Sequence, residues 1–219
     1  MINTLLFDLD GTLIDSEHFH FECWNEILQD YNTQLTIEEW VAHYAGVPMP
    51  TNAYSLIKKF NLLVTHAELV QRRENLTIEL LKTKEINLMP FALETLEYFA
   101  DKGFTMALVT GSPRQDVEAI FAKNNLGRFF KLIITRSEVV NSKPHPESYE
   151  LCINTLGIAK EECIVFEDTA NGVKSAKAAG LVCYAIQSNS VEHHKLDLAD
   201  KIFSDFNMAK LYLLETNQI

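Results

Sequence analysis

The sequence predicts an α/β fold in which a parallel sheet covered by helices carries an all-helical insert. Two observations favour this fold. From residue 91 onward, helical segments alternate four times with short apolar runs, as in parallel sheets whose strands are buried on both faces. Between a first apolar run at residues 5–7 and this alternating region, residues 16–85 show helical periodicity and no strand pattern.

The first expected strand, residues 5–7, leads directly into Asp8, Leu9, Asp10 and Gly11. Side chains two positions apart on a strand point to the same side, so the two carboxylates start out aimed together. Two close carboxylates repel each other unless a cation lies between them or one of them holds a proton. Gly11 permits a tight turn because it lacks a Cβ atom. Taken alone, the segment fits a solvated turn, a calcium loop or a catalytic pair.

The insert is expected to contain four helices. Thr36 and Glu39 form a capping-box pattern at the start of the second helix, and a break follows at residues 46–50. Pro90 ends the helical pattern where the chain returns to the sheet region. The expected helices cover residues 17–31, 37–44, 52–60 and 67–84. We therefore predict an inserted helical domain at 16–85 and an α/β domain at 1–15 and 86–219.

The alternating region supplies the rest of the predicted sheet. Its helices are expected at residues 91–101, 113–123, 147–156 and 170–179, and its strands at 104–109, 131–134, 163–166 and 181–186. Right-handed crossovers make such strands parallel, and ligands bind beyond their carboxyl ends. Polar residues follow the strands at this edge: Asp8 and Asp10, then Thr110, Gly111 and Ser112, then Lys143, then Glu167 and Asp168. The sequence therefore predicts one polar site there.

Four carboxylates dominate the expected site: Asp8, Asp10, Glu167 and Asp168. Hard oxygen ligands without nitrogen or sulfur suit Mg²⁺. A calcium loop is disfavoured, because a strand precedes Asp8 and no glutamate stands at the required later position. With a phosphate in the site, one aspartate can be the nucleophile and the other the acid/base. We assign Asp8, at the rigid strand end, as the nucleophile and Asp10, in the loop, as the acid/base.

The same edge also carries groups that suit a phosphate. The Thr110 hydroxyl, the backbone amides of Gly111 and Ser112 at a helix start, and the Lys143 ammonium are donors for a tetrahedral oxyanion. The chain has a formal net charge of −11, so an anionic substrate needs local cations. Mg²⁺, Lys143 and Arg114 are the cations that we expect there.

These residues resemble a known family. In this order, Asp8-Leu-Asp-Gly-Thr12, Thr110, Lys143-Pro144 and Glu167-Asp168 closely resemble the four motifs of the haloacid dehalogenase-like superfamily. The helical insert directly after the first motif looks like that family's alpha-helical cap of the first type. The segment Glu167-Asp-Thr-Ala-Asn-Gly172 is similar to the corresponding segment in the branch that contains beta-phosphoglucomutases and sugar-phosphate phosphatases.

The resemblance implies a Rossmann-like parallel sheet core with an inserted all-helical cap domain. It implies that Asp8 is nucleophile and Mg²⁺ ligand, and that Asp10 is acid/base and binds the metal through its backbone carbonyl. It further implies that Asp168 is a ligand, that Glu167 coordinates directly or through water, and that Thr110 and Lys143 hold the transferring phosphoryl group.

The residues that we expect to determine substrate specificity lie in the cap. His20, Trp24 and Gly46 fall where the mutase-like branch has a histidine, a tryptophan and a glycine, although His20 fits a packed helix histidine equally well. Mutases of this branch carry an arginine shortly after that glycine, whereas here Val47, Pro48 and Met49 follow. Losing an arginine whose forked donors suit phosphate favours a phosphatase. The expected substrate-binding residues are Gly11, His20, Gly46, Gly111, Ser112 and Arg114.

The predicted function is a Mg²⁺-dependent phosphatase that hydrolyses a small phosphorylated metabolite, such as a sugar phosphate, through an aspartyl-phosphate. The alternative is a beta-phosphoglucomutase-like phosphosugar mutase. A catalytically idle binding domain is disfavoured, because all reactive positions of the family are filled.

Bulk properties exclude several other classes. A net charge of −11 argues against nucleic acid or an anionic membrane surface as partner. The four cysteines lack metal-ligand spacing, so free thiols in a reducing compartment are expected. No apolar stretch approaches the length that crosses a bilayer, and the first residues do not resemble a signal peptide. We therefore expect a cytoplasmic monomer. Arg72 and Arg73 are expected on a solvated helix face.

Overall fold

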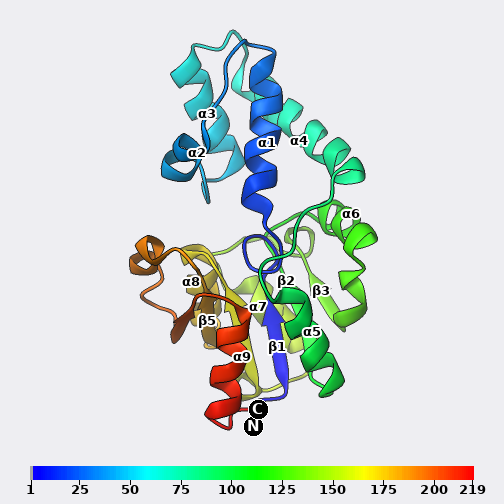
Figure 1. Ribbon diagram of the computed structural model, residues 1–219. Coiled ribbons are helices and arrows are strands. Elements are labelled where there is room, and N and C mark those ends of the chain that lie inside the picture. Colours follow the sequence, from blue (N-terminus) through cyan, green and yellow to red (C-terminus); the bar gives the residue numbers. More distant parts are fainter. Residues whose placement is uncertain (1) are drawn as a thin grey trace. The chain divides into compact units, whose positions relative to one another are not determined.

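The computed structural model describes residues 2–219 (Figure 1). The chain forms two compact units. An α/β unit contains the residues up to Asp15 together with Asn87–Ile219, and a helical unit contains Ser16–Ile86. Each unit has its own hydrophobic core, so each is described by itself.

A six-stranded parallel sheet forms the centre of the α/β unit. Its strands are β1 (Thr4–Phe7), β2 (Thr105–Val109), β3 (Leu132–Ile134), β4 (Cys163–Glu167), β5 (Val182–Ile186) and β6 (Lys201–Phe203). They lie in the order β3-β2-β1-β4-β5-β6, and every neighbouring pair is parallel. In the register, Leu6 lies opposite Ala107 on one side and Val165 on the other. The predicted parallel α/β fold is confirmed, and β1 occupies a central position in it.

Helices cover both faces of this sheet. They are α5 (Ala92–Asp101), α6 (Arg114–Asn124), α7 (Glu147–Leu156), α8 (Ala170–Ala178) and α9 (Phe206–Glu215). Short 3-10 turns occur at Leu126–Phe129, Arg136–Glu138, Lys160–Glu162 and Ser190–Lys195. Alternate residues of a strand face opposite sides, so Leu6 packs in one cluster with Tyr149 of α7 and Val173 of α8. Phe7 contacts the rings of Phe166 and Phe206 on the other side.

The last strand and helix, β6 and α9, have no counterpart among the elements predicted above. Strand β6 is a three-residue edge strand that begins with the exposed Lys201, so it lacks the apolar run that marks the central strands. It pairs with β5 alone and follows it through a segment that holds a 3-10 turn rather than an α-helix. Hydrophobic periodicity therefore detects the buried part of this sheet and misses its edge.

The helical unit contains α1 (Ser16–Gln29), α2 (Ile37–His43), α3 (Met49–Phe60) and α4 (His66–Thr83). Helix α1 buries one apolar stripe, namely Phe19, Cys23, Trp24, Ile27 and Leu28. The predicted capping box at Thr36 and Glu39 is present, with both reciprocal hydrogen bonds. Helix α3 begins at Met49 rather than in the predicted region near residue 52, because Pro50 fits a first helical turn, where no backbone N–H is needed.

Truncation of Phe7 tests the packing of the sheet. The Phe7 side chain is fully buried, and its ring centroid lies 5.1 Å from that of Phe166. Phe7→Ala should lower the free energy of unfolding of the α/β unit by about 3–5 kcal/mol, because a large buried ring leaves a cavity. Both tryptophans, Trp24 and Trp40, belong to the helical unit, so the loss should be followed by amide exchange in β1 and β4 rather than by fluorescence.

The matched control is Leu63→Ala, which truncates an apolar side chain that is 98% exposed. It should change stability by less than about 0.5 kcal/mol. Equal effects of the two variants would contradict the packing described for Phe7.

Candidate active site

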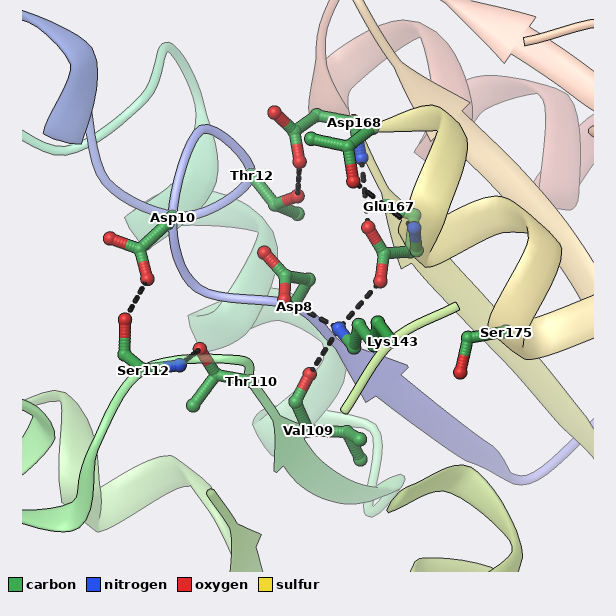
Figure 2. Close-up of polar contacts among 12 residues, drawn as sticks. Asp8, Asp10, Thr12, Val109, Thr110, Ser112, Lys143, Glu167, Asp168 and Ser175 are labelled. Atoms are coloured by element: carbon green, nitrogen blue, oxygen red, sulfur yellow. Dashed lines mark hydrogen bonds and ion pairs between the residues drawn. The ribbon is translucent and has the colours of Figure 1, made fainter. Parts of the chain in front are cut away.

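Polar side chains converge at the carboxyl ends of β1, β2 and β4 (Figure 2). Asp8 directly follows β1, Thr110 directly follows β2, and Glu167 is the last residue of β4. Because β1 lies between β2 and β4, Asp8 sits between the other two strand ends. Lys143 reaches the same place from the segment between β3 and α7.

Lys143 joins these strand ends. Its Nζ atom donates to Asp8 Oδ1 at 2.6 Å, to Glu167 Oε1 at 2.6 Å and to the Val109 carbonyl at 2.8 Å (Figure 2). The side chain is only 10% exposed. Burial opposes its charge, but the adjacent carboxylates of Asp8 and Glu167 raise the pKa of Lys143 above its ordinary value. Lys143 is therefore a fixed ammonium with all three of its protons engaged.

The loop that carries Lys143 is held at both sides. Glu147, in the first turn of α7, accepts from the backbone N–H of Val140 at 2.7 Å and of Asn141 at 2.9 Å. The buried hydroxyl of Ser175 in α8 donates to the His145 carbonyl at 2.7 Å. These bonds fix the backbone on either side of Lys143, so the position of its ammonium is determined by the fold.

Asp8, Glu167 and Asp168 form a cluster of carboxylates. Each offers an oxygen atom within 4.8 Å of the others. Burial raises the pKa of Asp8 to about 8, against the lowering effect of Lys143, and the charges of Glu167 and Asp10 add to the rise. Burial, Asp8 and Glu167 raise the pKa of Asp168 well above its ordinary value. One ammonium does not balance this much buried negative charge, so a further cation fits the cluster.

Two glycines allow the backbone to approach these carboxylates closely. Gly11 has a φ of +74°, and a Cβ atom on it would lie 2.1 Å from Asp168 Oδ2. A Cβ atom on Gly172 would lie 1.9 Å from Glu167 Oε2. Neither position has room for a side chain. Gly11, predicted to bind substrate, thus makes room for Asp168, and the buried Thr12 next to it donates to Asp168 Oδ1 at 3.1 Å.

Asp10 and the segment after β2 lie on the other side of Asp8 (Figure 2). The Ser112 hydroxyl donates to Asp10 Oδ2, and the backbone N–H of Ser112 donates to the Thr110 hydroxyl at 3.0 Å. Thr110 is buried, whereas Gly111 is exposed. The structure therefore brings Asp10, Thr110 and Ser112 together, as the strand-end argument predicts for their positions. Their chemical roles stay predictions.

Arg114 has other partners. Its guanidinium pairs with Glu138 at 2.9 Å and donates to the Ile133 carbonyl at 2.8 Å. None of these hydrogen bonds involves the carboxylate cluster. Arg114 thus ties the start of α6 to the 3-10 turn after β3, and the expectation that it supplies a cation for a phosphate gains no support from its contacts.

The remaining predicted residues belong to the helical unit. The His20 Nδ1 atom lies 2.9 Å from Nη2 of Arg73, whose guanidinium stacks over the Trp24 ring. Arg73 is only 3% exposed, so the expectation of a solvated Arg73 is wrong, whereas its neighbour Arg72 is exposed. Gly46 has a φ of +69° and donates its N–H to Glu17 at 2.9 Å.

Tyr149 was not predicted as a site residue, yet it contacts the cluster. It lies in α7 and is fully buried, and its hydroxyl donates to Glu167 Oε1 at 2.7 Å. Burial and the charges of Glu167 and Asp8 raise the pKa of Tyr149 well above its ordinary value, so the hydroxyl keeps its proton and acts as a donor. In the sequence, Tyr149 shares an apolar helical face with Cys152 and Ile153, which predicts a core position and gives no polar signal.

Comparison with known proteins identifies the family. The family model of haloacid dehalogenase-like hydrolases matches residues 5–186. This chain belongs to the haloacid dehalogenase-like hydrolases. The predicted family membership is therefore confirmed, and the matched range begins in β1 and ends with β5.

Several known proteins are similar to this haloacid dehalogenase-like chain over most of their length. A phosphorylated carbohydrates phosphatase of Thermotoga maritima is 29% identical over 184 residues, which cover 82% of each chain. A fructose-1-phosphate phosphatase of Escherichia coli is 32% identical over 178 residues, which cover 81% of this chain and 92% of that protein. The crystal structure of CbbY from Rhodobacter sphaeroides with phosphate shares the fold, with a TM-score of 0.76 at 24% identity, over 94% of this chain and 95% of that one.

Within residues 2–219, none of the helices combines the length and the apolar character that crossing a bilayer requires.

The raised pKa of Asp8 predicts a pH-dependent stability in EDTA. Between about pH 4 and pH 8 the folded state holds a proton on Asp8 that the unfolded state has lost, so stability should fall as the pH rises through this range. Asp8→Asn should reduce this dependence, because the amide does not ionise, while the raised pKa of Asp168 keeps part of it. The measurement is the thermal unfolding midpoint in EDTA at pH 5, 6.5 and 8.

Glu94→Gln is the matched control, since it removes one carboxylate from an exposed position on α5. It should leave the pH dependence of the midpoint unchanged. A dependence in Asp8→Asn as steep as in the unsubstituted protein would show that Asp8 does not carry the effect.

Proposed function

We propose that this chain is a Mg²⁺-dependent phosphatase that hydrolyses a small phosphorylated metabolite, such as a sugar phosphate, through an aspartyl-phosphate. The observation that carries the proposal is the buried contact of Asp8 with Lys143 beside a carboxylate cluster at the strand ends. A nucleophile, a fixed ammonium and a place for a cation are the groups that phosphoryl transfer requires. The phosphatases of phosphorylated carbohydrates among the relatives support the substrate class.

The donor set fits a magnesium ion. Asp8, Glu167 and Asp168 would hold it through carboxylate oxygens, and Asp10 through its backbone carbonyl, consistent with the preference of Mg²⁺ for oxygen ligands. When bound, the ion supplies positive charge that favours the ionised form of Asp8 and neutralises the oxygens of the phosphoryl group.

The protein's own residues divide the reaction between them. The Asp8 carboxylate attacks phosphorus, and the bond from phosphorus to the ester oxygen breaks as the new bond forms. Asp10 donates a proton to the departing oxygen. A water molecule then attacks the phosphorus while Asp10 takes its proton, which releases phosphate and restores Asp8. The Ser112 hydroxyl bound to Asp10 keeps this carboxyl in place, and Lys143 holds Asp8.

Replacing Asp8 tests the nucleophile. Asp8→Asn should lower phosphate release from sugar phosphates by roughly 10³-fold or more, because an amide neither attacks phosphorus well nor carries charge. Phosphate release is measured with and without Mg²⁺, and excess EDTA should abolish it in the unsubstituted protein. The control is Glu94→Gln, which leaves the site intact.

Three results would contradict the proposal. They are undiminished turnover in EDTA, a fully active Asp8→Asn variant, and efficient isomerisation of sugar monophosphates with little phosphate release in a coupled assay. The last result would favour the mutase alternative.

Replacing Asp10 tests the acid/base. Asp10→Asn should slow both formation and decay of the phosphorylated protein by about 10²–10⁴-fold, the usual contribution of a positioned acid/base. Acid quenching and intact-protein mass spectrometry measure the phosphorylated fraction over time. Ser112→Ala is the comparison, since it removes the hydrogen bond to Asp10 and leaves the carboxyl, so its effect should be smaller. A larger effect of Ser112→Ala would argue against the role of Asp10.

A further inference from the structure

The two carboxylate oxygens of Glu167 have different surroundings. Oε1 accepts from Lys143 Nζ at 2.6 Å and from the Tyr149 hydroxyl at 2.7 Å. Among the hydrogen bonds of residues 2–219, Oε2 accepts a single long one, 3.3 Å, from the backbone N–H of Asp168. A carboxylate oxygen has about two lone-pair sites, so the two donors at Oε1 occupy both of them. Only Oε2 is left for a cation.

Glu167 cannot rotate to change this arrangement. Its side chain is 1% exposed, and its carboxyl group lies so close to Gly172 that a Cβ atom there would overlap it. The Tyr149 ring also packs against the Lys143 ammonium that binds Glu167, with Nζ 5.0 Å from the ring centroid. The carboxylate is therefore confined by Gly172 and by the Tyr149–Lys143 pair.

One carboxylate oxygen of Asp8 is also engaged, because Lys143 donates to its Oδ1 atom. Divalent cations differ in how they use carboxylates. Mg²⁺ requires near-octahedral geometry and binds few carboxylate oxygens, whereas Ca²⁺ takes six to eight oxygens and often binds both oxygens of one carboxylate. A carboxylate that presents a single oxygen thus suits the smaller ion.

We propose that Tyr149 is a positioning residue that limits Glu167 to one metal-facing oxygen and thereby makes the site select Mg²⁺ over Ca²⁺. The inference rests on the metal site of the proposed function and adds its selectivity. Tyr149 acts through Glu167, and its phenolic proton occupies the acceptor site of Oε1 that Lys143 leaves open.

The test is the binding of Mg²⁺ and Ca²⁺ alone, measured by isothermal titration calorimetry on the full chain without substrate. Tyr149→Phe keeps the ring and removes the hydroxyl, which frees one lone pair of Oε1. Loss of a group that orients a ligand typically weakens metal binding by about 10–100-fold. We expect that Mg²⁺ binding weakens in this way while Ca²⁺ gains a second oxygen, so the ratio of Ca²⁺ to Mg²⁺ affinity rises about tenfold or more.

The matched control is Tyr184→Phe. It removes the hydroxyl of another buried tyrosine, one that donates to Gln218 Oε1 at 2.9 Å and not to a carboxylate of the cluster. The ratio of Ca²⁺ to Mg²⁺ affinity of this variant should equal that of the unsubstituted protein. In a Glu167→Gln background, Tyr149→Phe should no longer change the ratio, because the carboxylate through which it acts is gone.

The outcomes separate this inference from the proposed function. If the unsubstituted protein does not bind Mg²⁺, the proposed metal site fails and the selectivity with it. If it binds Mg²⁺ but Tyr149→Phe leaves the affinity ratio unchanged, or changes it equally in the Glu167→Gln background, only the role of Tyr149 fails. The unsubstituted protein tests the inference without any variant. If it binds Ca²⁺ more tightly than Mg²⁺, the inference is wrong.

Discussion

The buried ammonium of Lys143 is the interaction on which the site depends. It joins Asp8 after β1, the Val109 carbonyl at the end of β2 and Glu167 at the end of β4. A buried charge without partners is very costly, so Lys143 is stable there only when the sheet has the order β2-β1-β4. Lys143 thus binds a carboxylate that lies 135 positions away in the sequence. The topology of the sheet and the electrostatics of the site require each other.

The same burial leaves a charge imbalance that points to a cation. Three carboxylates meet one ammonium, and the pKa values of Asp8 and Asp168 are raised as a result. Such an arrangement costs stability in the absence of a cation. Structures tolerate this cost where function requires charged groups in close contact. The two glycines beside Asp168 and Glu167 show that the backbone, too, is shaped around these carboxylates.

Sequence patterns predict these features unequally, for physical reasons. Buried strands and amphipathic helices follow from hydrophobic periodicity, and residues directly after parallel strands must meet at one edge, which places Asp8 and Glu167 correctly. The direction of a side chain in a loop or on a helix does not follow from such patterns. Adjacent helical residues point about 100° apart, so Arg72 is exposed while Arg73 is buried. Tyr149 likewise looks like a core residue until its hydroxyl is seen to reach Glu167.

Glu167 and Asp168 are neighbours in sequence but are held in different ways. Glu167 ends β4 and accepts from a charged ammonium and a neutral hydroxyl. Asp168 lies beyond the strand, and its side chain accepts only the neutral hydroxyl of Thr12 among the hydrogen bonds described for residues 2–219. Its negative charge is therefore compensated less directly, in agreement with the strong rise of its pKa. A cation at the proposed metal site would therefore gain more from Asp168 than from Glu167, whereas Glu167 keeps Lys143 in place.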